Sequence, residues 1–235
     1  MMTRRLLVMG APTLMISQLS TAWAQQAAEP YVSWAELEVD PDKAVEFTRV
    51  AHESAAATLR EPSVIAFHFA AEKGNPGRLR VLEVYSSEDA YRAHLRSAHF
   101  RRFAQAAQAA SAVRRVYDVV PVLLGSKRVL NSASPHVRVA ELEIDATQLE
   151  AYKTAVTEEI DASIRLEPGV LAIYSLALRD RPTHLRFFEI YADETSYRQH
   201  IDSPHFKKYV EATKSMITAR KLIEMESPSI GVGER

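Results

Sequence analysis

A long segment of this chain occurs twice. Residues 83–103 read EVYSSEDAYRAHLRSAHFRRF, and residues 189–209, which lie 106 positions later, read EIYADETSYRQHIDSPHFKKY. Nine of these 21 pairs are identical, and most of the retained residues are Tyr, His, Glu and Phe rather than Ala or Leu. The period is far above the roughly 20 to 50 residues of a solenoid repeat and matches one small domain. The chain is therefore predicted to hold two copies of one folding unit.

The similarity extends toward the N-terminus of each copy. Residues 35–40 (AELEVD) recur as residues 140–145 (AELEID) at a spacing of 105, whereas Glu61-Pro62 recurs as Glu167-Pro168 at a spacing of 106. One residue has been gained between these blocks, most simply in a loop or at a helix end. Each copy is long enough that we expect it to bury a core of its own.

Each copy has the pattern strand, helix, strand, strand, helix, strand. Alternating apolar residues indicate the strands, and helix-start signals such as Asp40-Pro41 and helix-stop signals such as Glu61-Pro62 bound the helices. The expected strands are residues 31–39, 64–70, 79–85 and 113–124, then 137–144, 170–178, 184–191 and 219–225.

This βαββαβ order is typical of ferredoxin-like α+β folds, whose antiparallel sheet carries helices on one face. The second copy is the available cover for the other face. We therefore expect two sheets that pack face to face in an intrachain pseudo-dimer with a barrel-like core. The expected division is a signal peptide (1–24), a first domain (25–124), a linker (125–135), a second domain (136–227) and a tail (228–235).

The N-terminus has the features of a signal peptide. Arg4 and Arg5 precede a mildly apolar stretch, residues 6–19, and Ala22-Trp23-Ala24 follows it. A basic region, an apolar region and an A-x-A site in this order predict cleavage after Ala24. We expect a periplasmic or secreted protein, exported by the Sec or the Tat route, with no stable membrane span after cleavage.

Composition excludes some classes of site. The chain has no cysteine, so disulfides, cysteine-ligated zinc and thiol catalysis are excluded. The formal net charge is -1, which gives no indication of nucleic-acid binding, and the short basic pairs are expected to be solvated surfaces.

The repeated block places polar side chains on common faces. Glu83 and Tyr85 are two apart on a strand, and Tyr91 and His94 are three apart on the following helix, so each pair shares a side. The second copy has the same spacing in Glu189, Tyr191, Tyr197 and His200.

The second copy also predicts a break between two helices. Ser203 is a good N-cap and Pro204 a good first helical residue, so His205 should lie in the first turn of a new helix. The helix dipole disfavours imidazolium there, which predicts a neutral imidazole able to accept a proton. The same geometry is expected at His99, although Ala98 replaces the proline.

Structural roles for these residues remain open. The four histidines could be hydrogen-bonded groups that close the helix break, and Glu83 and Glu189 could pair with Arg80 and Arg186. The side chains of Phe100, Phe103, Phe206 and Tyr209 are expected to form core or pocket wall. His68 and its counterpart Tyr174 could each present a polar tip to a shared pocket. Glu83, His94 and His99 offer a set of possible metal ligands, but their spacing is not a known metal signature, and no metal site is expected.

The block E-x-Y-x5-Y-x2-H-x2-S-x-H-F, present in both copies, resembles the antibiotic biosynthesis monooxygenase (ABM) domain. That family of small dimeric α+β barrels includes quinol monooxygenase-like proteins. Its members oxygenate electron-rich phenolic or quinol-type aromatics without flavin, haem or metal, because the substrate itself reduces O2. The resemblance implies an exported, cofactor-independent monooxygenase whose partners are a small aromatic substrate and O2.

The resemblance also implies roles for individual residues. The candidate catalytic bases are His94, His99, His200 and His205, and the tyrosines would orient the oxygen substituents of the substrate. The candidate substrate-binding residues are His68, Glu83, Tyr85, Tyr91, Phe100, Tyr174, Glu189, Tyr191, Tyr197 and Phe206.

Two other activities found in this family are disfavoured by the sequence. The Asn, Trp and His set of the haem-degrading members is not evident, and no clear anion cradle supports an isomerase of small phosphorylated sugars. The alternative function is a non-catalytic periplasmic binding protein for a small hydrophobic molecule. Differences between the copies, such as Phe103 against Tyr209, allow one pocket to be specialised, and the pseudo-dimer could associate further.

Overall fold

The computed structural model describes residues 29–130 and 132–233. The expected signal peptide, Asn131 of the expected linker, and residues 234–235 lie outside this part of the chain. Within the described part, none of the helices combines the length and apolar character that crossing a membrane requires.

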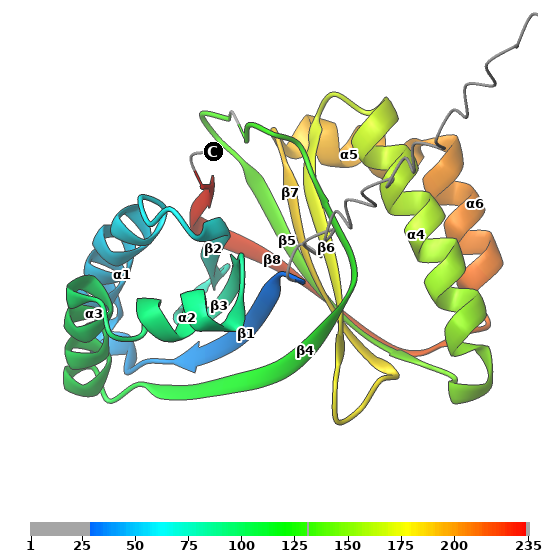
Figure 1. Ribbon diagram of the computed structural model, residues 1–235. Coiled ribbons are helices and arrows are strands. Elements are labelled where there is room, and N and C mark those ends of the chain that lie inside the picture. The colour runs from blue at the N-terminus through cyan, green and yellow to red at the C-terminus, as the bar shows by residue number, and fades with distance from the viewer. Residues whose placement is uncertain (1–28, 131, 234–235) are drawn as a thin grey trace, which may run out of the picture.

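The eight strands within the described residues form one closed barrel in the order β1-β3-β2-β8-β5-β7-β6-β4, and the helices cover its outside in two groups (Figure 1). The first copy consists of β1 (Tyr31–Glu38), η1 (Pro41–Lys43), α1 (Ala44–Thr58), β2 (Val64–Glu72), β3 (Asn75–Tyr85), α2 (Glu88–His94), α3 (Ala98–Ala109) and β4 (Val113–Ser126). The second consists of β5 (His136–Ile144), η2 (Ala146–Gln148), α4 (Leu149–Leu166), β6 (Val170–Leu178), β7 (His184–Tyr191), α5 (Glu194–Asp202), α6 (Pro204–Thr213) and β8 (Ile217–Val232). The α+β fold of two βαββαβ repeats in a pseudo-dimeric barrel is confirmed.

Two long strands join the copies. Residues 113–118 of β4 pair with β1, and residues 119–126 of the same strand pair with β6 of the second copy. In the same way β8 pairs first with β5 and then, through residues 225–232, with β2. The barrel thus replaces the two facing sheets that the sequence suggested. Gly125 and Ser126, expected in the linker, and residues 228–232, expected in the tail, are barrel strand instead.

Apolar side chains fill three regions. The barrel interior is a core shared by both copies and contains Trp34, Leu82, Tyr174 and Phe188. The other two cores lie between the outer face of the barrel and the helices of one copy, around Phe47 in the first and around Tyr152 in the second. Each copy therefore buries a core of its own on the outside and half of a common core on the inside.

Local sequence signals explain the helix ends. Ser203 accepts a hydrogen bond from Phe206 N and Pro204 starts α6, so the predicted break is confirmed; Ser97 caps α3 in the same way. Thr58 near the end of α1 and Ser163 near the end of α4 are equivalent buried positions of the two copies, and they lie 105 residues apart in sequence. The next equivalent pair, Glu61 and Glu167, lies 106 residues apart. The gained residue therefore lies at the C-terminal end of α4.

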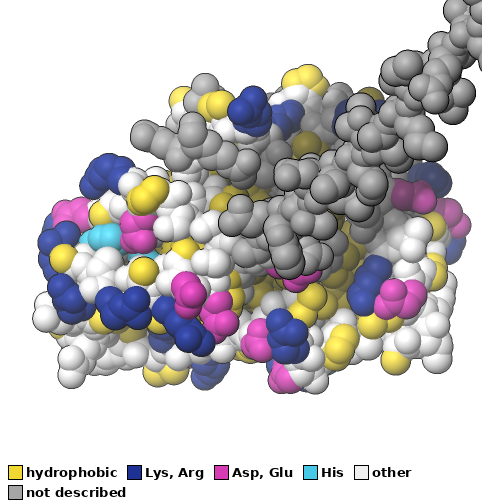
Figure 2. Space-filling view, in the orientation of Figure 1, with side chains coloured by type: hydrophobic (Ala, Val, Ile, Leu, Met, Phe, Trp, Pro, Cys, Tyr) yellow, Lys and Arg dark blue, Asp and Glu magenta, His cyan; other side chains and the backbone are white. Residues whose placement is uncertain are grey.

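The charged surface is mixed in sign. On the face shown in Figure 2, Lys and Arg side chains alternate with Asp and Glu side chains over the half that carries α1, α2 and α3. Alternation of this kind is typical of a solvated surface.

A small polar cluster lies inside the barrel. Arg80 lies 3.4 Å from Glu141 and 3.8 Å from Glu36, and Arg186 also lies 3.8 Å from Glu36. Side chains alternate along a strand, so these arginines point inward while Glu83 and Glu189 point outward. The alternative that the sequence left open, a pairing of Glu83 and Glu189 with Arg80 and Arg186, is therefore not formed.

His68 and Tyr174 meet in the same interior. The His68 Nε2 to Tyr174 OH distance is 3.1 Å, and Gly231 N donates to His68 Nδ1 at 3.3 Å. Because Nδ1 accepts, the ring proton lies on Nε2 and is donated to the tyrosine oxygen. Burial lowers the pKa of His68 to about 3, so the imidazole is neutral. The polar tips of His68 and Tyr174 therefore contact each other and do not line the shared pocket that the sequence suggested.

This buried histidine predicts acid sensitivity. The folded-state pKa of about 3 lies below the ordinary value of 6.5 for histidine, so the contribution of His68 is complete above pH 6.5 and is lost as the pH falls toward 3. Its share of the free energy of unfolding should fall by about 2–3 kcal/mol between pH 7 and pH 4.5. Urea unfolding of His68→Gln across this range should show a flatter pH dependence than the parent. Parallel curves for the two proteins would contradict the prediction, and Tyr174→Phe, which keeps the imidazole, is the control.

Candidate functional site

The repeated polar residues lie between the barrel wall and the helices. On β7, Tyr191 OH donates to Glu189 at 3.0 Å, and on β3 Tyr85 OH donates to Glu83 at 2.7 Å. The Tyr191 ring contacts His200 of α5 with centroids 5.4 Å apart, and Tyr85 contacts His94 of α2 at the same separation. The predicted sharing of faces by these strand and helix residues is confirmed in both copies.

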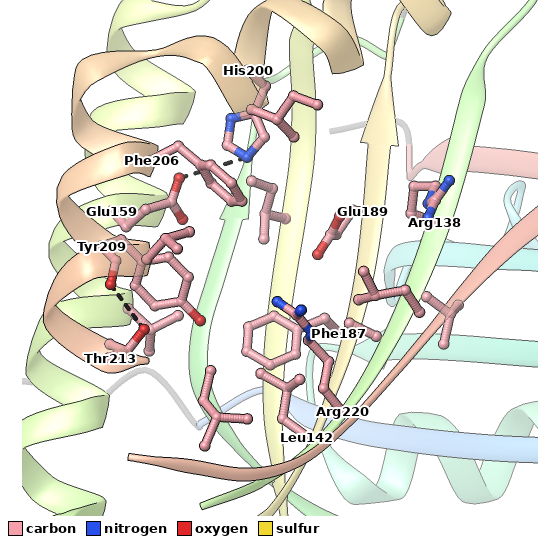
Figure 3. A pocket seen from close by; sticks show the side chains of 18 of the residues that line it. Arg138, Leu142, Glu159, Phe187, Glu189, His200, Phe206, Tyr209, Thr213 and Arg220 are labelled. Atoms are coloured by element: carbon pink, nitrogen blue, oxygen red, sulfur yellow. Dashed lines mark hydrogen bonds and ion pairs between the residues drawn. The ribbon is translucent and has the colours of Figure 1, made fainter. Parts of the chain in front are cut away.

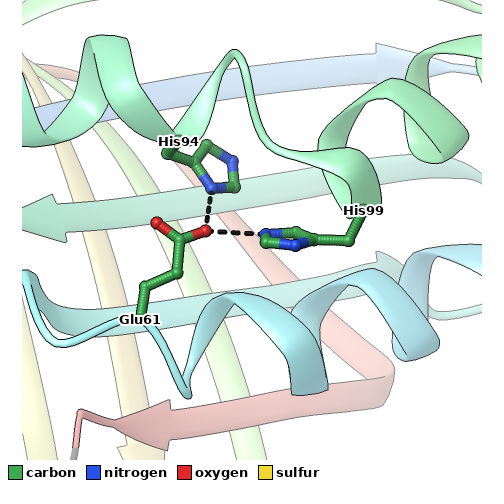
Figure 4. A group of neighbouring side chains, drawn as sticks. All are labelled: Glu61, His94 and His99. Carbon is green, nitrogen blue, oxygen red and sulfur yellow. Dashed lines mark hydrogen bonds and ion pairs between the residues drawn. The ribbon is translucent and has the colours of Figure 1, made fainter.

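A glutamate bridges the two histidines of each copy. Glu61 Oε1 lies 2.8 Å from His94 Nδ1 and 2.6 Å from His99 Nε2 (Figure 4). Glu167 Oε1 lies 2.9 Å from His200 Nδ1 and 2.6 Å from His205 Nε2. An ionised carboxylate only accepts hydrogen bonds, so these four nitrogens carry the protons. We call Glu61, His94 and His99 the first bridge, and Glu167, His200 and His205 the second bridge. The first connects the end of α1 to the break between α2 and α3, and the second connects the end of α4 to the break between α5 and α6.

The bridge leaves one nitrogen of His200 unused. Because Nδ1 donates to Glu167, the lone pair of the neutral ring lies on Nε2, which is 3.7 Å from Glu159 Oε1. That distance is too long for a direct hydrogen bond. Burial is the main cause that lowers the pKa of His200, so the imidazole is neutral at pH 7 and can accept a proton at Nε2.

Next to His200 lies a cavity of about 420 Å³, which we call the second cavity (Figure 3). Its volume is within the range of small-molecule sites, about 300 to 1,000 Å³. The equivalent first cavity, beside His94, has only about 30 Å³, room for about one water molecule. The two copies share a fold and a bridge but differ in the space they enclose.

Only some of the predicted site residues line one of the two cavities. Glu189, Tyr191, Tyr197, His200 and Phe206 all line the second cavity. Of the first-copy residues, Glu83, His94 and Phe100 line the first cavity. Tyr85 and Tyr91 pack behind it in the first outer core. The described structure places His99 and His205 in the bridges, away from the linings of both cavities, and places His68 and Tyr174 inside the barrel.

Sequence reasoning missed four residues of the second site. Glu167 was visible as the repeated Glu-Pro pair, yet nothing in its spacing predicts contact with the histidines. Glu159 stands where the first copy has Ser54, a pairing that the 105-residue spacing of the helix gives. Arg138 and Arg220 come from separate strands, and both line the second cavity.

The two carboxyl groups of the second cavity have unusual acidity. Burial raises the pKa of Glu159 to about 7 and the pKa of Glu189 to about 7. Ser163 Oγ donates to Glu159 at 2.6 Å, which opposes the shift only in part. Near neutral pH each carboxyl group can therefore give or take a proton.

The carboxylate that lies beside His94 and His99 is Glu61, not Glu83 as the sequence suggested for a metal site. Glu61, His94 and His99 form one group with ligand atoms within 4.8 Å of one another, and Glu159, His200 and His205 form another. Glu83 instead accepts the hydrogen bond of Tyr85. The set of Glu83, His94 and His99 is therefore not assembled.

The raised pKa of Glu159 predicts a stability cost at high pH. The folded-state pKa of about 7 exceeds the ordinary value of 4.5 for glutamate, so the cost is absent below pH 4.5 and grows as the pH rises toward 7. Glu159→Gln should gain about 2–3 kcal/mol over the parent at pH 8 relative to the same comparison at pH 5. Chemical denaturation at both pH values measures this, with the exposed neighbour changed in Glu158→Gln as control. An equal effect at both pH values would contradict the shift.

The bridges predict matched losses of stability. Glu167→Ala and Glu61→Ala each remove two charge-assisted hydrogen bonds and leave a buried imidazole N–H without its acceptor, at a cost of about 2–4 kcal/mol. Urea denaturation should give similar losses for the two variants, because the distances in the two bridges agree within 0.1 Å. A loss confined to one variant would show that the bridges are not equivalent.

Comparison with known proteins supports this architecture. The chain resembles a proposed monooxygenase from Lactobacillus acidophilus, with 20% identity and a TM-score of 0.79 over 86% of this chain and 96% of that one. A similar protein from Fusobacterium nucleatum gives 19% identity and a TM-score of 0.78 over 87% and 95%. At these identities the likeness establishes the fold.

Two sequence matches complete the comparison. An isomerase of (4S)-4-hydroxy-5-phosphonooxypentane-2,3-dione from Yersinia enterocolitica is 29% identical over 83 residues, which cover 35% of this chain and 85% of that protein. The family model described as antibiotic biosynthesis monooxygenase matches residues 30–106 and again residues 135–212, one match in each copy. With both halves matched, the chain belongs to the antibiotic biosynthesis monooxygenase family.

Proposed function

We propose that the second cavity is the active site of a cofactor-independent monooxygenase that acts on a quinol or phenolic aromatic with O2. The observation that carries the proposal is a cavity of about 420 Å³ lined by His200, Tyr209, two carboxyl groups and the rings of Phe187 and Phe206. Aromatic walls suit a planar ring, and polar side chains reach the cavity from several sides (Figure 3).

His200 is the base in this proposal. Its Nε2 takes the proton of a substrate hydroxyl, while Glu167, 2.9 Å from Nδ1, stabilises the imidazolium that forms. Glu159, 3.7 Å from Nε2, adds a second acceptor on the same side. The product of this step is an electron-rich phenolate.

The phenolate supplies the electrons for O2. Its ring carbon forms a bond to one oxygen atom, and the peroxide that results takes back a proton from the imidazolium. Loss of the ring C–H proton then breaks the O–O bond, so one oxygen atom stays on the ring and the other leaves as water. A quinol loses four electrons in total, which is the number that O2 takes up, so no further reductant enters the reaction.

The first copy has a different role in this proposal. Benzene fits an engineered cavity of about 150 Å³, whereas the first cavity has about 30 Å³. Ser54 also leaves that site without the carboxyl group that Glu159 brings to the second. The first copy therefore serves to complete the barrel.

Matched histidine variants test the proposal. His200→Gln should lower O2 consumption with a panel of quinols by about 100-fold or more, because it removes the base. His94→Gln, the equivalent change beside the first cavity, should leave turnover within about twofold of the parent, since no ring enters there. Oxygen-electrode rates, with folding checked by circular dichroism, make the comparison.

Three results would count against the proposal. Unchanged turnover in His200→Gln would remove that residue from the chemistry, and equal losses in both variants would contradict the difference between the copies. Ligand binding without O2 consumption by the parent would favour the alternative function, a binding protein for small hydrophobic molecules.

A further inference from the structure

Two arginines line the second cavity on the side away from the proposed base. Arg138 comes from β5 and Arg220 from β8. In Figure 3 the Arg138 guanidinium lies across the cavity from His200 and Glu159, whereas the Arg220 guanidinium reaches the middle of the cavity beside Phe187, and Glu189 lies between the two arginines. A ligand that fills the cavity would therefore meet a proton acceptor at one end and positive charge along the rest of its length.

Neither arginine forms a close ion pair with a carboxylate of the described residues. Arg138 approaches Glu224 only to 3.9 Å, and Lys73 already holds that carboxylate at 2.5 Å. Arg138 also stacks on Tyr197, 4.9 Å from the ring centroid. Within residues 29–130 and 132–233, Arg220 has no ion-pair partner at 4.0 Å or less. Both guanidinium groups therefore retain N–H donors that could bind an anionic ligand in the cavity.

The nearby acidic groups offset this charge only in part, although Arg138 is close enough to Glu189 to oppose the rise in the pKa of that carboxyl group. Arginine stays protonated at all relevant pH values, whereas burial raises the pKa of both Glu159 and Glu189 to about 7. At and below neutral pH the carboxyl groups are therefore at most partly ionised. The cavity as a whole is positive.

The copies differ at one of the two positions. Arg220 corresponds to Arg114 of the first copy, which lies 6.0 Å from the Phe100 ring centroid and lines the small first cavity. Arg138 corresponds to Ser33, which is buried. The pair of guanidinium groups thus occurs only in the copy whose cavity can hold a ring.

We propose that the substrate of the second cavity is a hydroxylated aromatic acid, whose carboxylate is attracted by the positive charges of Arg138 and Arg220 while its ring hydroxyl faces His200. This inference rests on the proposed function for the reacting end of the molecule and adds the chemical class of the other end. The two arginines come from strands that meet only in the folded barrel, so no short motif in the sequence indicates this anion site.

The inference is tested with a matched pair of probes on the whole chain. The probes are 2,5-dihydroxybenzoate and 2,5-dihydroxybenzamide, which share a quinol ring and differ in the charge of one substituent. The acid should bind the parent about tenfold or more tightly than the amide, as expected for hydrogen bonds between charged groups. Added salt should weaken only the acid.

Arginine variants identify the residues responsible. Arg138→Gln and Arg220→Gln should each weaken binding of the acid by about tenfold and leave the amide unchanged. Arg114→Gln, the first-copy counterpart of the second variant, should change neither. Isothermal titration calorimetry gives the dissociation constants, and thermal melting confirms that each variant folds.

The outcomes separate this inference from the proposed function. Equal affinity for acid and amide, binding of neither, or an acid preference that survives both variants would overturn the inference even if quinols consume O2. A preference for the acid that depends on the arginines, without O2 consumption, would support the inference and contradict the monooxygenase proposal. A phenyl phosphate that binds while the benzoate does not would also overturn the assignment of a carboxylate.

Discussion

The structure depends on the closure of one barrel by strands from both copies. A sheet that ended at β4 or β8 within its own copy would expose unpaired backbone groups along an edge, which invites association. Each of these strands instead continues into the other copy, so all eight strands have two neighbours. This backbone pairing fixes the copies relative to each other without help from the residues on the outer faces. The helix-covered sites are consequently free to diverge.

The two sites have diverged around a constant bridge. The Glu–His–His arrangement is nearly the same in both copies, including the copy whose cavity is almost filled. Its retention there is explained by support of the helix break, which is the structural role that the sequence left open. The functional difference lies in residues around the bridge, where Glu159 and Arg138 replace the small hydroxyl side chains Ser54 and Ser33.

Sequence patterns predict what depends on near neighbours in the chain. The break at Ser203 and Pro204 and the shared face of Glu189 and Tyr191 follow from capping and from strand alternation, and the structure contains both. The continuation of β8 to Val232 depends on pairing with β2, far away in sequence. Contacts such as that of Glu167 with its histidines likewise form only after folding. The volume of each cavity depends on how all its walls pack, which no short motif encodes.

One consequence follows from the meeting of His68 and Tyr174. These positions are equivalent in the two repeats, 106 residues apart, and they touch, so they must lie close to the axis that relates the halves. In an assembly of two identical subunits, a residue in that place would face its own copy, and neither could be the obligate donor. Joining the subunits in one chain lifts that symmetry. The imidazole and the phenol can then take fixed and opposite parts in a single directional hydrogen bond.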